Sequence, residues 1–476
     1  MARLTTRRRA WIGLAVVTGL AALAAGAWGL QRWAPFADDP AVTWPANVRP
    51  LAAFTERTTR THFTEPVTIE FVGDADEYAA RVSSPDAPEP TEADRADAAI
   101  DEAVGRALGL WQGDISLLTI RATFAGSAPF PATWLPDENA IVVNVVDAKS
   151  KLSPAIRAQL TLVLAQALDD QRYQTLQRAR QAATAQDYQA AIAVSIGHAI
   201  WVHDRYLDDL SPEDLDAYYA EQGDSNERFA EEMADVPISY VALRSVAQQL
   251  GPMFIEALTE QDHQLLSHAF TDEAPVALDQ VSLPAGKYLR RDPLEPVTAP
   301  PGPGAADVRY SNQMGPFALY LLLSTGLPSN VALTAADGWG NDRYTAYVLD
   351  DRVCVDVHLV ADSRDDAQQL ENGLNGWARA RPATAGALVG RQGTDLYASA
   401  CDPGAAADQP VPTKEAIARY VARAREIQQR TDSSGSPALA ECVAVAAFAR
   451  ADLGDPESVD FLTGVDSIEQ DCLHSV

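Results

Sequence analysis

Residues 156–173 constrain the fold more than any other stretch of the chain, because they read as one long buried helix. Leu160, Leu164 and Leu168 recur with helical spacing, and the residues between them are largely apolar as well. A serine and a proline stand directly before the stretch, a pair typical of a helix start. The pattern predicts a core helix against which neighbouring elements pack.

The second half of this helix resembles a known motif. Residues 167–173, ALDDQRY in one-letter code, resemble the end of the active-site helix of zincin-like metallopeptidases in a membrane-anchored, actinobacterial form. In that family the helix reads His-Glu-x-x-His-Ala-Leu-x-Asp-Gln-x-aromatic, where two histidines bind zinc and the glutamate is the general base. The resemblance implies an α+β, zincin-like metallopeptidase fold.

The residues that would carry the chemistry of this family are all replaced. The two zinc-ligand positions fall on Leu162 and Gln166, and the general-base position falls on Val163. The third ligand of the family, a glutamate on the next helix, falls on Ile196. Aliphatic side chains cannot bind a metal, and an amide oxygen is at best a weak ligand. We therefore expect a degenerate, catalytically inactive domain (a pseudo-peptidase) with no metal and no cofactor.

The amino-terminal residues predict a membrane anchor. Residues 1–10 are basic, and residues 11–30 are uncharged and apolar, long enough to span a bilayer about 30 Å thick. The arginines place the amino terminus in the cytoplasm and the bulk of the chain outside. The alternative is a cleaved signal peptide, because residues 22–27 contain small side chains suited to cleavage. We favour a single-pass cell-membrane protein with an extracytoplasmic bulk.

The charge of the chain limits its partners. The net charge is −29, and residues 1–32 contribute +5, which leaves −34 for the rest. A chain this acidic is repelled by nucleic acid and by anionic membrane surfaces. We expect no nucleic-acid partner; the expected partner is an unidentified protein or cell-envelope component.

Four cysteines lie late in the sequence, at Cys354, Cys401, Cys442 and Cys472. Four cysteines allow three pairings, and an exported location favours disulfides. We expect Cys354–Cys401 and Cys442–Cys472, because each pair lies within one apparent subdomain. Four buried free thiols are the alternative.

The remaining patterns divide the chain into regions. We expect, in order, a basic tail (1–10), a membrane span (11–30), an extracytoplasmic tether (31–65), a zincin-like domain (66–292), a Pro/Gly linker (293–309), a smaller α+β subdomain (310–404) and a helical carboxyl-terminal region (405–476). Alternating apolar patterns predict strands at 67–72, 115–123, 140–146, 345–349, 352–360 and 395–400. Helical periodicity predicts helices at 91–110, 185–207, 210–233, 236–261, 314–323, 365–377, 414–430 and 439–453.

A second segment supports the resemblance. Residues 335–344 resemble the family's Ala-Ala-x-Gly-Trp-Gly-x-Asp-Arg-Tyr, and they contribute the candidate residues Gly338, Trp339, Gly340, Asp342, Arg343 and Tyr344. These residues form either a ligand-binding loop or a packed turn, and we favour the packed turn.

Three functions remain open. A non-catalytic protein with a binding or scaffolding role fits the lost ligands best. An active hydrolase would need other groups near the former zinc position, for example Asp169, Asp170, His198 or Asp204. His198 and His203 lie about 140° apart around a helix, which argues against a shared metal. The third possibility is a purely structural envelope protein.

Overall fold

The computed structural model describes residues 44–82, 90–126, 130–271, 273–304, 306–450 and 459–474. The predicted membrane span at 11–30 lies outside these residues. Among the helices that are described, none is long and apolar enough to cross a membrane. From Trp44 to Val476 the chain forms one compact unit.

Helices predominate in this unit. They are α2 (Arg49–Thr59), α3 (Ala75–Val82), α4 (Glu92–Leu108), α5 (Leu117–Gly126), α6 (Pro154–Tyr173), α7 (Thr175–Arg180), α8 (Ala185–Asp208), α9 (Pro212–Glu232), α10 (Ile238–Gln261), α11 (His263–Ala269), α12 (Leu278–Ser282), α13 (Gly315–Ser324), α14 (Ser329–Asp337), α15 (Arg364–Ala380), α16 (Lys414–Ser434), α17 (Pro437–Ala449) and α18 (Val459–Leu473). The strands are β1 (Thr68–Phe71), β2 (Ala132–Leu135), β3 (Ala140–Val143), β4 (Asp307–Asn312), β5 (Trp339–Leu349), β6 (Arg352–Ala361), β7 (Leu388–Gln392) and β8 (Asp395–Cys401).

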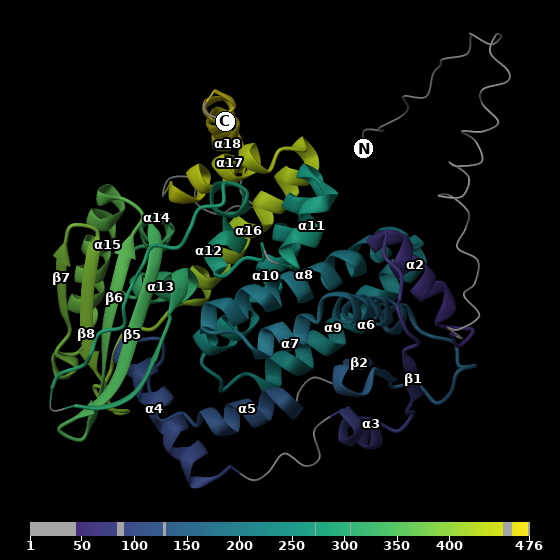
Figure 1. Ribbon diagram of the computed structural model, residues 1–476, viewed down its shortest axis with the longest axis horizontal. Helices are drawn as coiled ribbons and strands as arrows, with labels where there is room; N and C mark the ends of the chain where they lie inside the picture. Colours follow the sequence, from purple (N-terminus) through teal and green to yellow (C-terminus); the bar gives the residue numbers. More distant parts are fainter. Residues whose placement is uncertain are drawn as a thin grey trace. The chain divides into compact units, whose positions relative to one another are not determined.

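A small sheet packs against α6. Its strand order is β1-β3-β2, with β1 parallel and β2 antiparallel to β3. All four residues of β3 are buried, as the run of β-branched side chains requires of a central strand. Figure 1 shows the five-stranded sheet on the left of the view and this small sheet on the right, with α8 and α10 between them.

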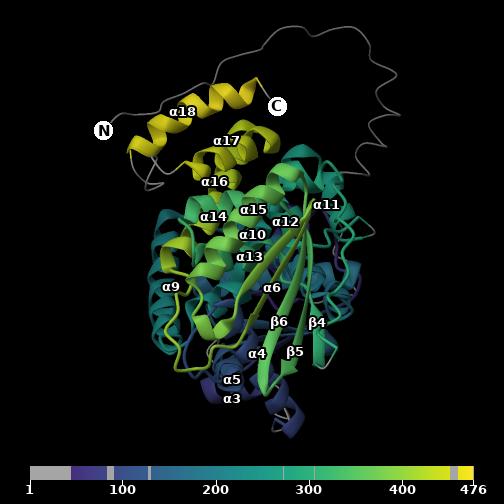
Figure 2. The ribbon, with the colours of Figure 1, turned by 90° about the vertical axis from the view of Figure 1, so that its left-hand side faces the viewer.

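The larger sheet has the order β4-β5-β6-β8-β7, and all its neighbouring pairs are antiparallel. Asp350 and Asp351 join β5 to β6 with positive φ values of 49° and 58°, as a tight primed hairpin turn requires. The inward face, with Val357 of β6 and Leu396 of β8, meets apolar residues of α4, α13 and α15. Figure 2 shows α13 and α15 beside β5 and β6.

The expected Pro/Gly linker lies along the outer face of this sheet. The Thr345 hydroxyl donates to the Pro300 carbonyl at 2.6 Å, and the His358 Nδ1 atom lies 3.0 Å from the Thr298 carbonyl oxygen. Residues 293–304 therefore form a strap held to β5 and β6.

One hydrophobic core unites the expected regions. It runs from Val104 of α4, through α8, α10 and the larger sheet, to Cys472 of α18. The regions expected at 66–292, 310–404 and 405–476 therefore share buried surface.

The structure corrects two expectations about the amino-terminal half. Part of the expected tether, residues 49–59, is helix α2, whose Leu51, Ala52 and Thr55 are buried on one helical face. Residues 115–123 were expected to form a strand, but α5 covers most of them. Leu117 and Ile120 lie three residues apart and are both buried, a helical spacing that outweighs the β-branched composition.

Both disulfides form as predicted. Cys354 bonds to Cys401 across the neighbouring strands β6 and β8, and Cys442 of α17 bonds to Cys472 of α18. The second bridge reaches a third carboxyl-terminal helix that the sequence patterns did not predict.

Candidate functional site

The positions that the expected resemblance assigns to the zinc ligands and the general base lie on α6 and α8. Val163 is 2% exposed and belongs to a core cluster with Leu160 and Leu164. Leu162 is half-buried and contacts both this cluster and the large core. Gln166 and Ile196 are also half-buried. Among these four side chains, only the Gln166 amide has an atom that could bind a metal.

The motif residues beside these positions hold the fold together. The Asp170 carboxylate accepts a hydrogen bond from the Leu176 N–H at 3.0 Å, and so caps the start of α7. The Gln171 amide accepts from the Thr64 N–H at 3.1 Å and donates to the Asn139 side chain at 3.2 Å. Both side chains are engaged in joining α6 to its neighbours.

Gly197 of α8 lies at a close crossing with α10. A Cβ atom on Gly251 of α10 would lie 2.6 Å from the Cα atom of Gly197 and 2.3 Å from the Ala193 carbonyl oxygen. No real Cβ contact is that short, so α8 and α10 can approach this closely only with glycine at the crossing.

A buried Asp–His pair joins α6 to α8. The His198 Nδ1 atom lies 2.7 Å from a carboxylate oxygen of Asp169, and both residues are 3% exposed. Burial raises the pKa of Asp169, and the nearby His198 opposes that shift. The His198 ring lies against Trp201 and Phe270, and its Nε2 atom is buried with no hydrogen-bond partner in the described residues.

This pair has the orienting half of a catalytic triad but lacks the rest. In such a triad the second imidazole nitrogen bonds the nucleophile, and here no hydroxyl or thiol of the described chain does so. His203 has separate partners, Asp204 at 2.9 Å and the Tyr218 hydroxyl at 3.3 Å. The two histidines of α8 therefore do not converge on a common site.

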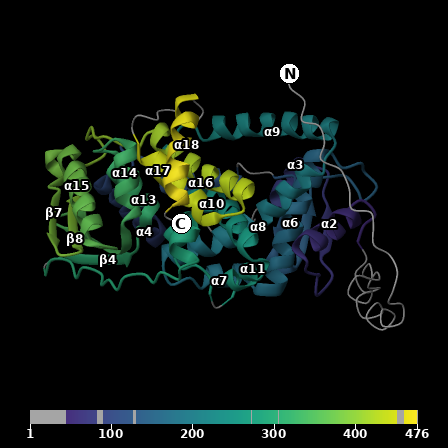
Figure 3. The same ribbon diagram turned by 90° about the horizontal axis from the view of Figure 1, so that it is seen from above.

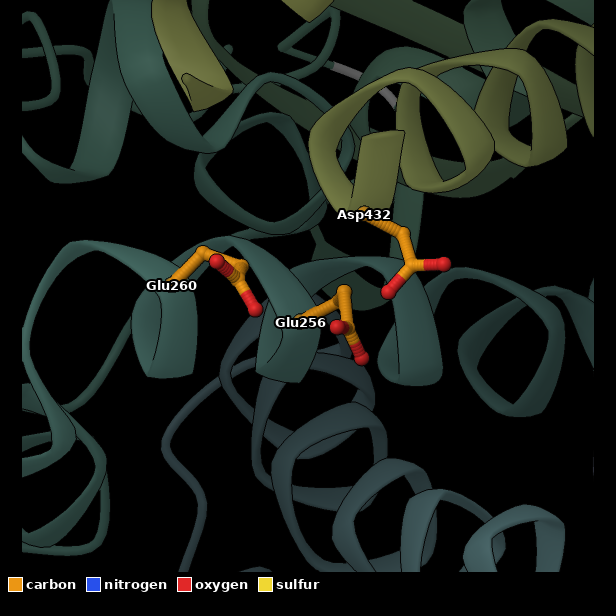
Figure 4. Close-up of side chains that lie close together, drawn as sticks. All are labelled: Glu256, Glu260 and Asp432. Atoms are coloured by element: carbon orange, nitrogen blue, oxygen red, sulfur yellow. The ribbon is translucent and has the colours of Figure 1, made fainter. Parts of the chain in front are cut away.

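An acidic cluster gives the described residues their one group with metal-binding spacing. The carboxylates of Glu256, Glu260 and Asp432 have oxygens within 4.8 Å of one another (Figure 4). Glu256 is buried, which raises its pKa, but it accepts from Trp201 Nε1 at 2.7 Å and pairs with Arg205 at 2.9 Å. An arginine already neutralises this carboxylate, so we assign the cluster no metal.

The Gly-Trp-Gly-Asn-Asp-Arg-Tyr segment opens β5 and is largely packed inside. Asp342 has no exposed surface, and its carboxylate accepts from the N–H groups of Met314 and Gly315 at 2.7 Å each. Trp339, also fully buried, donates its Nε1–H to the same carboxylate at 2.8 Å. Burial raises the pKa of Asp342, and these three donors oppose the shift. Asp342 thus caps the start of α13.

Three other members of this segment, Gly338, Gly340 and Tyr344, also pack closely against neighbouring residues. A Cβ atom on Gly338 would lie 2.4 Å from the Asp366 Cβ atom, and the Gly340 carbonyl accepts from the Glu295 N–H of the strap. Tyr344 packs edge-on against Tyr310. Arg343 is half-exposed on the strand. The segment is a packed structural element.

An open groove lies at the carboxyl end of α6. It has a volume of about 600 Å³ and is lined by Arg172, Tyr173, Gln174, Arg178, Phe270 and Thr271. The sequence analysis did not predict it. The signal available was a pair of arginines six residues apart across a helix break, in a chain that is otherwise strongly acidic.

Comparison with known proteins identifies a family for one region. Residues 306–409 match a sequence family described as a domain of unknown function, DUF8575. This stretch contains β4 to β8, the whole of the larger sheet. No curated protein and no solved structure matches the chain.

Proposed function

We propose that this chain is a non-catalytic, membrane-anchored extracytoplasmic protein with a degenerate zincin-like core that serves a binding or scaffolding role. The observation that carries the proposal is the aliphatic chemistry at the positions of the zinc ligands and base. Leu162, Val163 and Ile196 have no lone pair to offer a metal, and Val163 is part of a core cluster.

The packing around α6 supports a fold that stands without a metal. Burying an aliphatic side chain contributes about 1.5–3 kcal/mol. A structural zinc, in contrast, ties folding to the metal. The retained motif residues, such as Asp170 and Gln171, make hydrogen bonds that position α6 and need no ion.

Two observations support placement outside the cytoplasm. Two disulfides are formed, and disulfides persist in oxidising compartments. The amino-terminal residues 1–30 have the charge and length expected of a cytoplasmic tail and a membrane anchor.

The buried Asp169–His198 pair keeps a second candidate open, an active hydrolase that uses non-standard residues near the former zinc position. A purely structural envelope protein is the third. A hydrolase that used this pair would require an accessible imidazole nitrogen, and the buried Nε2 atom of His198 makes this candidate the weaker one. If the wild-type chain cleaves peptide substrates and His198→Gln abolishes cleavage, the hydrolase replaces our proposal.

Metal analysis tests the proposal directly. The full chain, purified in detergent without chelator, should contain no stoichiometric zinc by elemental mass spectrometry. Its melting temperature should be the same with and without EDTA. One zinc per chain together with a melt lowered by EDTA would contradict the proposal.

A restoration variant tests the correspondence with the resembled family. The substitutions Leu162→His, Val163→Glu, Gln166→His and Ile196→Glu rebuild the three ligands and the base. Added zinc should raise the melting temperature of this variant and leave that of the wild type unchanged. The matched control keeps Ile196 and carries the other three changes. Because it has one ligand fewer than the quadruple variant, zinc should raise its melting temperature by less. A quadruple variant that folds but whose melting temperature does not change with zinc would show that the correspondence is wrong.

A further inference from the structure

The groove at the end of α6 gathers positive charge on a strongly negative chain. Arg172 and Arg178 both line it, and neither has a carboxylate within ion-pair distance in the described residues. Nearby arginines do: Arg180 pairs with Asp137 at 2.8 Å, and Arg291 pairs with Glu273 at 3.0 Å. The two groove arginines therefore keep their charge unneutralised by any carboxylate of the described residues.

Both guanidinium groups are held in place by neutral partners. The Arg178 Nη1 atom donates to the carbonyls of Phe270 and Thr271, at 3.1 and 2.7 Å. The Arg172 Nε atom donates to the Tyr173 hydroxyl at 3.1 Å, and its guanidinium lies over the Tyr173 ring. These contacts fix the orientation of the arginines without cancelling their charge.

The partners are themselves anchored. The Tyr173 ring stacks on Phe270 with ring centroids 4.6 Å apart and planes nearly parallel. Gln174, the residue after Tyr173, adopts a left-handed backbone with a φ of 53°. This conformation ends α6 and turns the chain into α7. The turn brings the last two residues of α6 and Arg178 of α7 to the same groove.

Several donor nitrogens remain for a ligand. The bonds described above occupy Nε of Arg172 and Nη1 of Arg178. The other guanidinium nitrogens of both residues make no hydrogen bond within the described chain. Guanidinium forks match the oxygens of phosphate and carboxylate, and charge-assisted bonds of this kind are about twice as strong as neutral ones.

We propose that this groove binds a small molecule that carries a phosphate group. Two unneutralised guanidiniums match a doubly charged phosphate monoester better than a singly charged carboxylate. A groove of about 600 Å³ has the size of a small-ligand site. The proposal adds to the non-catalytic function without depending on it, because the groove contains none of the former zinc positions.

Calorimetric titration of the full chain with glycerol 3-phosphate tests the proposal, with glycerol as the uncharged control. Glycerol 3-phosphate should bind and glycerol should not. Arg172→Gln should weaken binding by at least about tenfold, because it removes one charge-assisted contact from an exposed side chain. Arg178→Gln should weaken it similarly, and Arg172→Gln keeps the test valid if Arg178→Gln does not fold.

The matched control is Arg180→Gln. It removes the same charge two residues from Arg178, at a side chain paired with Asp137 and outside the groove lining. The affinity of the Arg180→Gln variant for glycerol 3-phosphate should stay within about twofold of that of the wild type. Absence of binding at millimolar glycerol 3-phosphate, or an equal loss in Arg180→Gln and Arg172→Gln, would overturn the proposal. Zinc content is measured separately, so the two proposals fail independently.

Discussion

The close packing of α8 against α10 predicts whether a glycine-to-alanine substitution at their crossing raises or lowers the stability of the protein. We expect Gly251→Ala to destabilise the protein. In an exposed helix the same change stabilises by about 0.5–1 kcal/mol, because alanine is the better helix former. Here the added Cβ atom would lie 2.3 Å from the Ala193 carbonyl oxygen and 2.6 Å from the Gly197 Cα atom.

The magnitude follows from those distances. Both close atoms belong to the backbone of α8, so no side-chain rotation can relieve the contact, and the helices must separate by roughly an ångström. Overpacking of this kind costs about 1–3 kcal/mol and outweighs the propensity gain. The net loss should therefore be about 1–2 kcal/mol.

Urea unfolding of the full chain, followed by circular dichroism, measures this loss. The matched control is Gly223→Ala on α9, where a Cβ atom meets nothing within 4 Å. Figure 3 shows α9 along one side of the chain. Gly223→Ala should raise the urea midpoint and Gly251→Ala should lower it. Equal shifts of the same sign would refute the close crossing.

Two further predictions concern buried carboxylates. Asp342→Ala leaves the N–H donors of Met314, Gly315 and Trp339 without an acceptor, so it should lower the free energy of unfolding in urea by at least about 3 kcal/mol. The control, Arg343→Gln at the neighbouring partly exposed position, should lower it by less than about 1 kcal/mol. Comparable losses in the two variants would contradict the capping role. Burial raises the pKa of Asp279 from 3.8 to about 7, although Lys287 opposes the shift. Its contribution to stability is therefore complete below pH 3.8 and is lost as the pH rises to about 7. Asp279→Asn should consequently be more stable than the wild type at pH 8, by up to about 4 kcal/mol, and the difference should shrink towards pH 4; a pH-independent difference would refute this assignment.

The sequence predicted those elements whose local pattern and tertiary role agree. The long helices α6, α8 and α10 carry a strong apolar periodicity, and the β5–β6 hairpin has Asp350 and Asp351 at the turn, so these elements could be located from the residues alone. Pairing of Cys354 with Cys401 followed from their placement within one region.

Elements defined by distant contacts were missed or misassigned. Helix α2 is short, and its burial depends on surfaces of α6 and α8 that are far away in sequence. In α5 the β-branched residues favour a strand by propensity, but the Glu102 carboxylate accepts from the Leu117 N–H at 2.7 Å and fixes the start of a helix. Strand β4 forms only because β5 supplies a partner.

The candidate sites divide in the same way. The absence of metal-binding side chains at Leu162, Val163 and Ile196 could be read directly from residue types. The groove at Arg172 and Arg178 could not, because its shape depends on Phe270 and Thr271, which follow α11 almost a hundred residues later in the sequence. Sequence spacing identifies residues on one helix and does not reveal which loop closes the site.

The continuous core has a consequence for how the chain reaches its native state. The apolar faces of α10 are covered in part by α16 and α17, which are made after it. While the chain is being synthesised, these central faces stay open to water and to other apolar surfaces until residues after 414 become available. Folding cannot be completed segment by segment from the amino terminus, and the nascent chain depends on α16 and α17 for protection from aggregation.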